Sequence, residues 1–275
     1  MSGGGALRIA IQGERGAYSE EAALALYGRE IEVLPRRTLA DVFAALAAEE
    51  ADGAAVPVEN SRAGTVVEAY DELVRHPFAV YGEHLQPIHH CLLGLPGSEL
   101  SGIRHVKSHP QALSQCREYL RARGIDAVAA YDTAGSAKDL AAVGDPAVAA
   151  IASRRAGEIY GLSILATEIE DAKDNQTLFY AVGAPPRAAG GGAGRTVVAF
   201  HVANRPQALV SCLEPFASRG LNLSKLESRP SGLRPFEYVF YTVVDSHVSE
   251  AACAEAMSEL RERAAAARVL GSYRL

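Results

Sequence analysis

Neutral polar side chains gather at the predicted ends of strands, and their types and positions could support chemistry. Hydroxyls, amides and imidazoles can orient a small molecule that carries carboxylates without holding it in a salt bridge. They recur here because strands pass into helices through Ser or Thr next to Gly or Pro. The candidates are Asn60, Ser61, His109, Gln111, Thr133, Ser136, Asn175 and Thr177.

Thr177 lies in the stretch DNQTLFYAV, where four polar residues run directly into an apolar, strand-like tail. A threonine there is either a β-branched residue in a strand position that suits it or a hydroxyl directed at a ligand. For any single Ser or Thr, helix capping is the plainer explanation, and Thr38 with Asp41 has the spacing of a capping box. The recurrence at several strand ends favours a binding site.

An open α/β sheet would bring these residues together. Before residue 183, short apolar segments alternate with helical patterns, which predicts an α/β fold with a largely parallel sheet. Loops at the carboxyl ends of such strands face one crevice, where helix N termini also offer free N–H groups. One helix is predicted over Pro110–Arg121. The predicted strands are LRIAI (7–11), IEVL (31–34), GAAVPV (53–58), IRHV (103–106), DAVAAY (126–131) and AVAAI (147–151).

One break in composition divides the chain. The stretch GAPPRAAGGGAGR, residues 183–195, is rich in the residues of flexible connections and cannot form a helix or a central strand. After it, the pattern reads strand, helix, strand, strand, helix, strand, which is the ferredoxin-like order. These elements are predicted at 195–202, 207–219, 221–228, 236–244, 249–265 and 269–273.

Composition and charge exclude several classes of protein. The 275 residues are 48% hydrophobic, which suits a globular protein with sizeable cores. A net charge of −6 without a basic run argues against nucleic-acid binding. No apolar run approaches the roughly 20 residues that cross a bilayer, and the first residues lack the pattern of a secretory signal. We therefore expect no membrane association and a cytoplasmic location.

Disulfide, metal and phosphate sites find little support in the sequence. Cys91, Cys116, Cys212 and Cys253 lie far apart without a C-x-x-C pair, so reduced core thiols are expected. The histidines between residues 84 and 109 do not form the helical H-x-x-x-H pattern of a zinc site. Neither a P-loop nor a complete G-x-G-x-x-G is present.

Seven ordered stretches resemble the prephenate dehydratases and the related arogenate dehydratases. A further stretch after the break, RPQALVSCLEPFASRGLNLSKLESRP, resembles the ACT regulatory domain of those enzymes. The resemblance implies a catalytic domain at 7–183, a linker at 184–194 and an ACT domain at 195–273. The seven stretches are QGERGAYSEEAA, PVENSRAGTV, GEHLQPIHHCLL, SHPQALSQC, DTAGSA, IASRRAGEIYGLSIL and DNQTLF.

The resemblance implies a catalytic domain of two α/β lobes, similar to type II periplasmic binding proteins, with the substrate between the lobes. One lobe would run to about residue 81 and be rejoined after about residue 165. The implied reaction converts prephenate to phenylpyruvate: carbon dioxide and the ring hydroxyl leave, and the ring becomes aromatic. No cofactor or metal is expected.

Roles for individual residues follow from the resemblance. Thr177 resembles the essential threonine of the family, and we assign its hydroxyl as a hydrogen-bond donor to the leaving oxygen, because acid assistance lowers the barrier to hydroxide departure. The leaving carboxylate gains from a site with few charges. The pyruvyl carboxylate is assigned to the groups near 108–111 and 133–136. Ser108 and Phe179 complete the predicted substrate-binding set.

Two departures from the family pattern matter. Leu178 replaces the usual Arg after the threonine, and alternation along a strand predicts that Leu178 points away from the substrate if Thr177 faces it. Arg15 and Arg62 lie on loops that could supply a replacement cation. Gln207 replaces the usual Gly of the phenylalanine site, which predicts weaker feedback by phenylalanine.

The ACT resemblance also implies an effector and an assembly. Phenylalanine would bind between two such domains, so a homodimer or homotetramer is expected. The motif at residues 227–230 is intact. The predicted effector site consists of Leu209, Asn222, Glu227 and Ser228.

Three alternatives stay open on the sequence. The chain could prefer arogenate, the amino analogue of prephenate. It could be a prephenate decarboxylase that releases carbon dioxide without aromatisation. It could also be a catalytically silent amino-acid sensor, although retention of Thr177 argues against this, because a pure binding protein needs no leaving-group donor.

Overall fold

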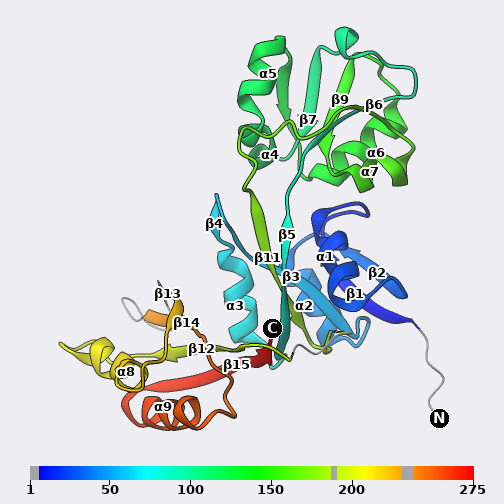
Figure 1. The fold of residues 1–275 in the computed structure, drawn as a ribbon. Coiled ribbons are helices and arrows are strands. Elements are labelled where there is room, and N and C mark those ends of the chain that lie inside the picture. The colour runs from blue at the N-terminus through cyan, green and yellow to red at the C-terminus, as the bar shows by residue number, and fades with distance from the viewer. Residues whose placement is uncertain (1–5, 187–190, 231–237) are drawn as a thin grey trace. The chain divides into compact units, whose positions relative to one another are not determined.

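A computed structural model describes residues 6–186, 191–230 and 238–275 of the protein. The chain packs as two compact units, and its course is traced in Figure 1. Unit 1 holds the residues up to Ala69 together with His84–Tyr180, and unit 2 holds Tyr70–Glu83 together with the residues from Ala181 onward. Residues 187–190 of the predicted linker lie outside the described residues.

The first lobe of unit 1 is a sheet flanked by two helices. Its elements are β1 (Leu7–Gln12), α1 (Tyr18–Tyr27), β2 (Ile31–Arg36), α2 (Leu39–Ala47), β3 (Gly53–Asn60), β4 (Gly64–Thr65) and β11 (Gln176–Val182). β1 pairs in parallel with β2 and β3, and β11 is the other neighbour of β3. Both helices pack on these strands, and the capping box predicted at Thr38 and Asp41 is present at the start of α2.

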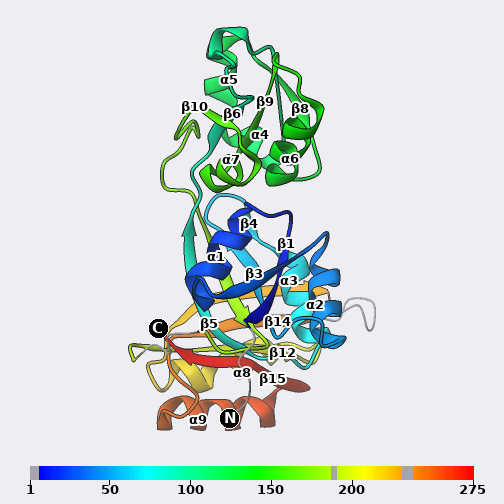
Figure 2. The same ribbon diagram turned by 90° about the vertical axis from the view of Figure 1, so that its right-hand side faces the viewer.

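The second lobe is a smaller sheet with helices on both faces, shown at the top of Figure 2. Its strand order is β10-β6-β9-β7-β8. Its elements are β6 (Cys91–Gly94), η1 (Leu100–Gly102), β7 (His105–Ser108), α4 (Pro110–Gln115), α5 (Arg117–Arg123), β8 (Asp126–Ala129), α6 (Thr133–Val143), β9 (Val148–Ala152), α7 (Arg154–Tyr160) and β10 (Ser163–Ala166).

Side-chain alternation explains why the central strands of this lobe are apolar throughout. Cys91 and Leu93 of β6 pack with α6 and α7, whereas Leu92 between them packs with α4 and α5 on the opposite face. In β9, Ala150 and Ile151 divide between the faces in the same way. A strand buried on both faces reads as a continuous apolar run. The α/β class predicted from these runs is confirmed.

Two predictions for this lobe are wrong. Its sheet is mixed, since β7 pairs in parallel with β8 and β9 but β6 pairs antiparallel with β9 and β10. The helix predicted over Pro110–Arg121 is broken at Cys116 into α4 and α5. The Gln115 carbonyl accepts the Asp171 N–H at 2.7 Å, and the Asp171 carboxylate accepts the Glu118 N–H at 3.2 Å. Asp171 thus forms hydrogen bonds with a carbonyl and an N–H group that would otherwise pair within a continuous helix.

Unit 2 has the predicted order of strand, helix, strand, strand, helix, strand. Its elements are β12 (Gly194–His201), α8 (Ala208–Ala217), β13 (Leu223–Pro230), β14 (Tyr238–Val244), α9 (Ala251–Arg263) and β15 (Ala266–Arg274). The strand order is β13-β14-β12-β15, with antiparallel neighbours. Residues 236–237 of the strand predicted at 236–244 lie outside the described residues.

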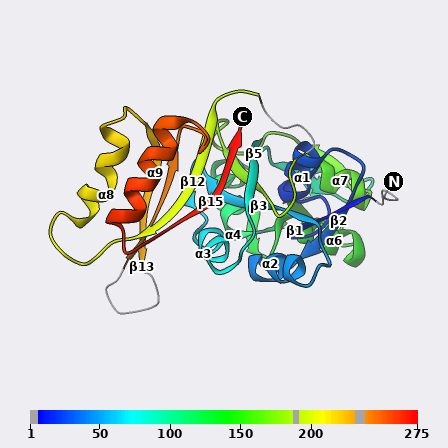
Figure 3. The same ribbon diagram turned by 90° about the horizontal axis from the view of Figure 1, so that it is seen from below.

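The helices α8 and α9 lie side by side on one face of this sheet, as Figure 3 shows. The opposite face receives a segment that the sequence pattern did not assign to this unit. That segment includes most of α3 (Val67–Arg75) and the start of β5 (Val80–Pro87). Tyr70 packs against Tyr241 with ring centroids 5.0 Å apart, and the Tyr273 hydroxyl donates to Glu83 at 2.7 Å.

The cysteines meet a further expectation. All four cysteines are free and buried, as predicted for core thiols. None of the helices in the described ranges has the length and apolar character that a membrane crossing requires.

Gln207 begins α8 with a left-handed backbone, φ 65° and ψ −3°. A side chain with a Cβ adopts this conformation at a cost of about 1–2 kcal/mol, whereas glycine adopts it freely. The position therefore favours the glycine that the chain lacks.

Replacing Gln207 with Gly should raise the free energy of unfolding by about 1 kcal/mol, because the Cβ clash disappears. Gln207→Ala is the matched control: it keeps the Cβ and should change stability by less than about 0.5 kcal/mol. Guanidinium unfolding followed by circular dichroism measures both. Equal stability of the Gly and Ala variants would show that the left-handed backbone at position 207 is not strained by a Cβ.

Candidate active site

The Asn60 carboxamide ties the end of β3 to the start of β11. Its Oδ1 accepts the backbone N–H groups of Arg62 at 3.1 Å and Ala63 at 2.9 Å, which fixes the orientation of the amide. Its Nδ2 therefore faces β11, where it lies 2.9 Å from Thr177 Oγ1 and 2.9 Å from Asn175 Oδ1. The Thr177 hydroxyl accepts from Asn60, so its own proton stays available to another acceptor.

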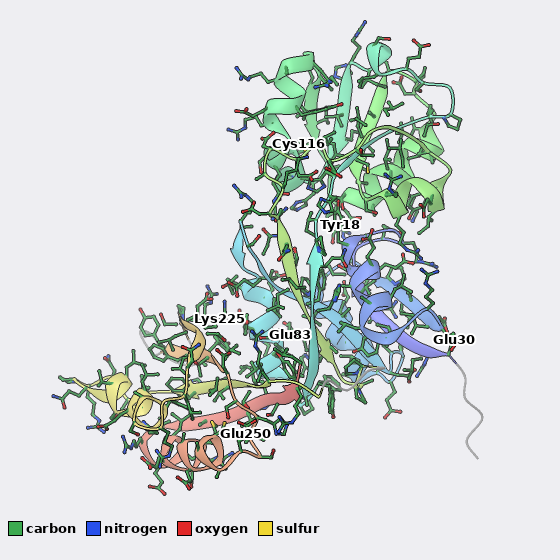
Figure 4. All side chains as sticks on the ribbon, viewed as in Figure 1. Tyr18, Glu30, Glu83, Cys116, Lys225 and Glu250 are labelled. Carbon is green, nitrogen blue, oxygen red and sulfur yellow. The ribbon has the colours of Figure 1, made fainter. Side chains whose placement is uncertain are left out.

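The hydrogen bonds continue from Asn175 into the second lobe and back to the first. Asn175 Nδ2 donates to Gln115 Oε1 at 3.0 Å, and the same oxygen lies 2.9 Å from His90 Nε2. His90 Nδ1 lies 3.0 Å from the Tyr18 hydroxyl on α1. Tyr18 is labelled in Figure 4 where the two lobes meet. This chain of contacts, Tyr18, His90, Gln115, Asn175, Asn60 and Thr177, is called the amide network below.

The amide network is neutral because burial penalises charge. Burial lowers the pKa of His90, so the imidazole is uncharged at neutral pH. Since Gln115 Oε1 is an amide oxygen and can only accept, the imidazole donates from Nε2 and leaves Nδ1 as an acceptor. The Tyr18 hydroxyl faces both this nitrogen, at 3.0 Å, and the His89 carbonyl, to which it donates at 2.8 Å. Burial also raises the pKa of Tyr18 well above its ordinary value, which keeps its hydroxyl protonated.

Two adjoining cavities open onto this network. The inner one, of about 120 Å³, has no Arg, Lys, Asp or Glu among its described lining residues, which include Tyr18, His90 and Thr177. The outer one, of about 420 Å³, shares Tyr18 and Thr177 but adds Arg37 and Asp132. A third cavity, of about 350 Å³, borders Gln115 and Asn175 from the side of Arg62 and Glu170.

The structure brings five of the nine predicted substrate-binding residues together with Thr177. Each lines the inner cavity, which places groups from β3, α4, α6 and the start of β11 around one volume. The five are Asn60, His109, Gln111, Thr133 and Asn175.

Four predicted residues do not line the cavities described above. The hydroxyls of Ser108 and Ser136 donate to the carbonyls of Ile151 and Asp132, each at 2.7 Å. Ser61 lies against β11, where its Oγ accepts the Gln176 N–H at 3.0 Å. Phe179 is buried. These residues shape the lobes around the site.

The structure also locates Leu178 and the two arginines considered as its replacements. Leu178 lines none of these cavities, as alternation next to Thr177 predicts. Arg15 is paired with Glu20 at 3.0 Å and does not line them either. Arg62 pairs with Asp174 at 2.7 Å and borders only the third cavity.

Sequence analysis did not select Tyr18, His90, Gln115 or Glu170 as site residues. Glu170 accepts the His90 N–H at 2.9 Å and lies 3.1 Å from His89 Nδ1, which holds the segment that carries His90. Burial opposes ionisation of Glu170, but these hydrogen bonds outweigh it and lower its pKa. Within the described ranges, no three His, Cys, Asp or Glu side chains group as metal ligands would.

Glu20 anchors the loop that forms one wall of the outer cavity. Its fully buried carboxylate accepts the Gly16 N–H at 2.6 Å and pairs with Arg15 at 3.0 Å and Arg155 at 2.7 Å. Gly16 has φ +84°, and a Cβ there would lie 2.6 Å from the Ala156 Cα, so the loop and α7 touch through backbone. Burial raises the pKa of Glu20, but its three donors outweigh burial and lower the pKa overall.

In unit 2, the predicted effector residues lie on α8 and along β13. Leu209 packs on the core between the helices and the sheet. Asn222 Nδ2 donates to Asp245 at 2.6 Å, and Glu227 lies 3.3 Å from Lys225. Ser228 is exposed on β13.

Glu20→Gln should lower the free energy of unfolding at pH 7 by about 3 kcal/mol, because two arginines and a buried N–H lose their anion. A lowered folded pKa means that the stabilisation exists above the unfolded pKa, near 4.3, and is lost as pH falls through the folded pKa. The difference from the unaltered protein should therefore shrink below about pH 4. Glu158→Gln, an exposed neutralisation on α7, is the control and should change stability by less than about 0.5 kcal/mol. A pH-independent difference for Glu20→Gln would argue against the ion pairs as its cause.

Comparisons with known proteins find relatives that match nearly the whole chain. An Arabidopsis thaliana relative, arogenate dehydratase/prephenate dehydratase 2, chloroplastic, is 38% identical over 283 residues, which cover 99% of this chain and 74% of the relative. The crystal structure of prephenate dehydratase from Arthrobacter aurescens in complex with L-Phe matches with a TM-score of 0.89 and 33% identity, over 98% of this chain and 90% of that one.

A second solved structure is equally similar and carries a different description. It is described as a novel type of quorum quenching acylase, and it matches with a TM-score of 0.89 and 35% identity over 97% of both chains. The prephenate dehydratase family model matches residues 9–187, which include the strands, loops and amide network around Thr177. This chain belongs to the prephenate dehydratase family.

Proposed function

We propose that the chain is a carbon–oxygen lyase that converts prephenate to phenylpyruvate in phenylalanine biosynthesis. The observation that carries this proposal is that the Thr177 hydroxyl accepts a hydrogen bond from the protein and keeps its own proton to donate. Asn60 donates to Thr177 Oγ1 at 2.9 Å, so the threonine proton can point into the inner cavity as a donor. A positioned donor is what departure of a ring hydroxyl requires.

The reaction can be followed through these groups. The bond between the ring and its carboxylate breaks, carbon dioxide leaves, and the electron pair moves into the ring. The ring carbon–oxygen bond breaks in turn, and its electrons leave with the oxygen, which Thr177 stabilises through its hydrogen bond. The same movement makes the ring aromatic.

An inner cavity without Arg or Lys among its described residues assists the loss of carbon dioxide. Negative charge must leave the carboxylate for the ring, and a cation bound to that carboxylate would oppose the movement. The described residues that line the inner cavity include no Arg, Lys, Asp or Glu, and His90 is uncharged because burial lowers its pKa.

Acyl transfer fits the site less well. A serine or threonine nucleophile needs a neighbouring base to take its proton. Among the described residues that line the inner and outer cavities, no Ser or Thr hydroxyl contacts an imidazole or carboxylate, and the partner of Thr177 is an amide donor. This arrangement supports dehydration over hydrolysis of an amide.

Product identification tests the proposal. The purified chain is incubated separately with prephenate and arogenate, and the products are identified by mass and ultraviolet absorbance. We expect phenylpyruvate from prephenate, and phenylalanine from arogenate if the amino analogue is accepted. Release of carbon dioxide with a non-aromatic dihydro product that keeps its hydroxyl would replace this proposal with the decarboxylase alternative. Binding without turnover would indicate a sensor.

The C-terminal unit is proposed as an ACT regulatory domain. Its element order and antiparallel sheet support this assignment, and the related Arthrobacter aurescens structure is described as a complex with L-Phe. Phenylalanine is the expected effector, bound near Leu209, Asn222, Glu227 and Ser228 in a homodimer or homotetramer. A cytoplasmic location stays a prediction.

Thr177→Val keeps the shape of the side chain and removes the donor, so turnover should fall by about 100-fold or more while substrate binding changes little. Thr177→Ser keeps the hydroxyl and is the matched control, for which most turnover should survive. Steady-state kinetics with prephenate measure both variants. Near-normal turnover in the Val variant would remove Thr177 from the mechanism.

Phenylalanine should bind weakly to the unaltered protein, because Gln207 places a side chain where α8 begins. Gln207→Gly should tighten binding severalfold, and Gln207→Ala separates the effect of side-chain bulk from that of the backbone. Isothermal titration with phenylalanine supplies the three affinities. Tight binding by the unaltered protein would contradict this expectation.

A further inference from the structure

Arg37 is a cation at the outer cavity that sequence analysis did not single out. It follows β2 and lines the same volume as Thr133 and Thr177. The guanidinium carbon lies 4.9 Å from the centre of the Tyr131 ring, and the Tyr131 hydroxyl donates to the Arg37 carbonyl. These contacts hold Arg37 from both its backbone and its side chain.

Three neighbouring arginines are each paired with a carboxylate, whereas Arg37 has no such partner among the described residues. Arg15 pairs with Glu20 at 3.0 Å, Arg36 pairs with Glu50 at 2.7 Å, and Arg62 pairs with Asp174 at 2.7 Å. Within the part of the chain that the structure describes, Arg37 makes no ion pair, and no other Arg or Lys lines the inner or outer cavity. Its guanidinium is therefore open to an anion in the outer cavity.

Asp132 lines the same cavity, and its carboxylate is the protein group that could compete with a substrate for Arg37. Its carboxylate accepts the Gly135 N–H at 2.7 Å and so caps α6. Burial raises the pKa of Asp132. The backbone N–H groups of Gly135, Glu14 and Thr133 lower it, but by less. Asp132 thus serves the helix terminus, and the structure does not pair it with Arg37.

The two cavities differ in charge, and the two carboxylates of prephenate differ in fate. The ring carboxylate leaves as carbon dioxide and gains from neutral surroundings, whereas the side-chain carboxylate stays in the product and gains from a firm anchor. Among the described residues, Arg37 is the one Arg or Lys that lines either cavity, and it lines the outer one, where Asp132 is engaged as the cap of α6. The position of this cation therefore favours the side-chain carboxylate in the outer cavity.

We propose that Arg37 is a specificity-determining residue that binds the side-chain carboxylate in the outer cavity, and so directs the ring carboxylate toward the inner cavity and Thr177. The identity of the substrate rests on the proposed function. The chemistry that Arg37 recognises is more general: a carboxylate on a short chain beyond a six-membered ring. Prephenate and arogenate share this group, so Arg37 serves both.

The test compares Arg37→Gln with the conservative Arg37→Lys and with the matched control Arg36→Gln, whose partner Glu50 lies outside the cavities. Arg37→Gln should raise KM about tenfold for prephenate with a much smaller change in kcat. Arg37→Lys should recover part of the loss, and Arg36→Gln should leave KM unchanged. Because Arg37 is exposed, the KM of the unaltered protein should also rise with salt more steeply than that of Arg37→Gln.

A binding measurement separates this proposal from the proposed function. Phenylpyruvate keeps the side-chain carboxylate, whereas phenylacetone has a methyl group in its place. Arg37→Gln should weaken phenylpyruvate binding about tenfold in calorimetry and leave phenylacetone binding unchanged. Unchanged phenylpyruvate affinity and KM in a folded, active Arg37→Gln variant would overturn the role of Arg37 while the dehydratase reaction stands. Arg37-dependent phenylpyruvate binding by a chain that dehydrates neither substrate would support Arg37 and reject the proposed reaction.

Discussion

One buried side chain, the carboxamide of Asn60, sets the geometry on which the candidate active site depends. A buried amide must satisfy both its oxygen and its nitrogen, and Asn60 does so only in one orientation. Its oxygen takes the two backbone N–H groups of the following turn, so its nitrogen must face Asn175 and Thr177. The turn after β3 and the start of β11 are therefore held in one register, although 117 residues separate Asn60 from Thr177.

This constraint explains why the site needs contacts from both lobes. Asn175 is fixed at its oxygen by Asn60 and at its nitrogen by Gln115, so the first lobe is tied to α4 of the second. Gln115 Oε1 accepts from Asn175 and from His90, which selects the imidazole tautomer. The contacts orient the Asn60, Asn175 and Gln115 amides, and the Thr177 hydroxyl proton is left free to meet a ligand. Such a network specifies one arrangement, because a flipped member would leave buried groups unpaired.

The sequence predicted the parts of the site that depend on local pattern. The end of β3 and the start of β11 are marked by polar residues next to apolar runs, so Asn60, Asn175 and Thr177 could be chosen as candidates. Hydroxyls of the same kind at Ser108 and Ser136 could not be told apart from them, because their carbonyl partners are set by packing within the second lobe. Local pattern identifies a polar group, but its partner decides whether the group faces a ligand.

Other features depend on contacts that no local pattern records. The break between α4 and α5 comes from Asp171, which lies 53 residues beyond Glu118, and the role of Tyr18 comes from His90, 72 residues away. Arg36 and Arg37 are adjacent and chemically identical, yet one pairs with Glu50 and the other lies beside Tyr131 at the cavity. The antiparallel pairing of β6 similarly follows from the path of the chain, since its apolar composition suits either direction.

A hydroxyl donor suits this site better than a carboxylic acid would. An acid that must be protonated at neutral pH needs a strongly raised pKa, and any residual charge would oppose loss of carbon dioxide from the substrate. The nearby carboxylates are instead drawn into structural roles: Glu20 and Glu170 are held ionised by their donors, and Asp132 caps a helix. A threonine hydroxyl is uncharged both before and while it donates a hydrogen bond, and Asn60 sets the direction of its proton. Neutrality therefore comes from the choice of a hydroxyl, the direction of its proton comes from the Asn60 hydrogen bond, and the charged groups shape the walls around the site.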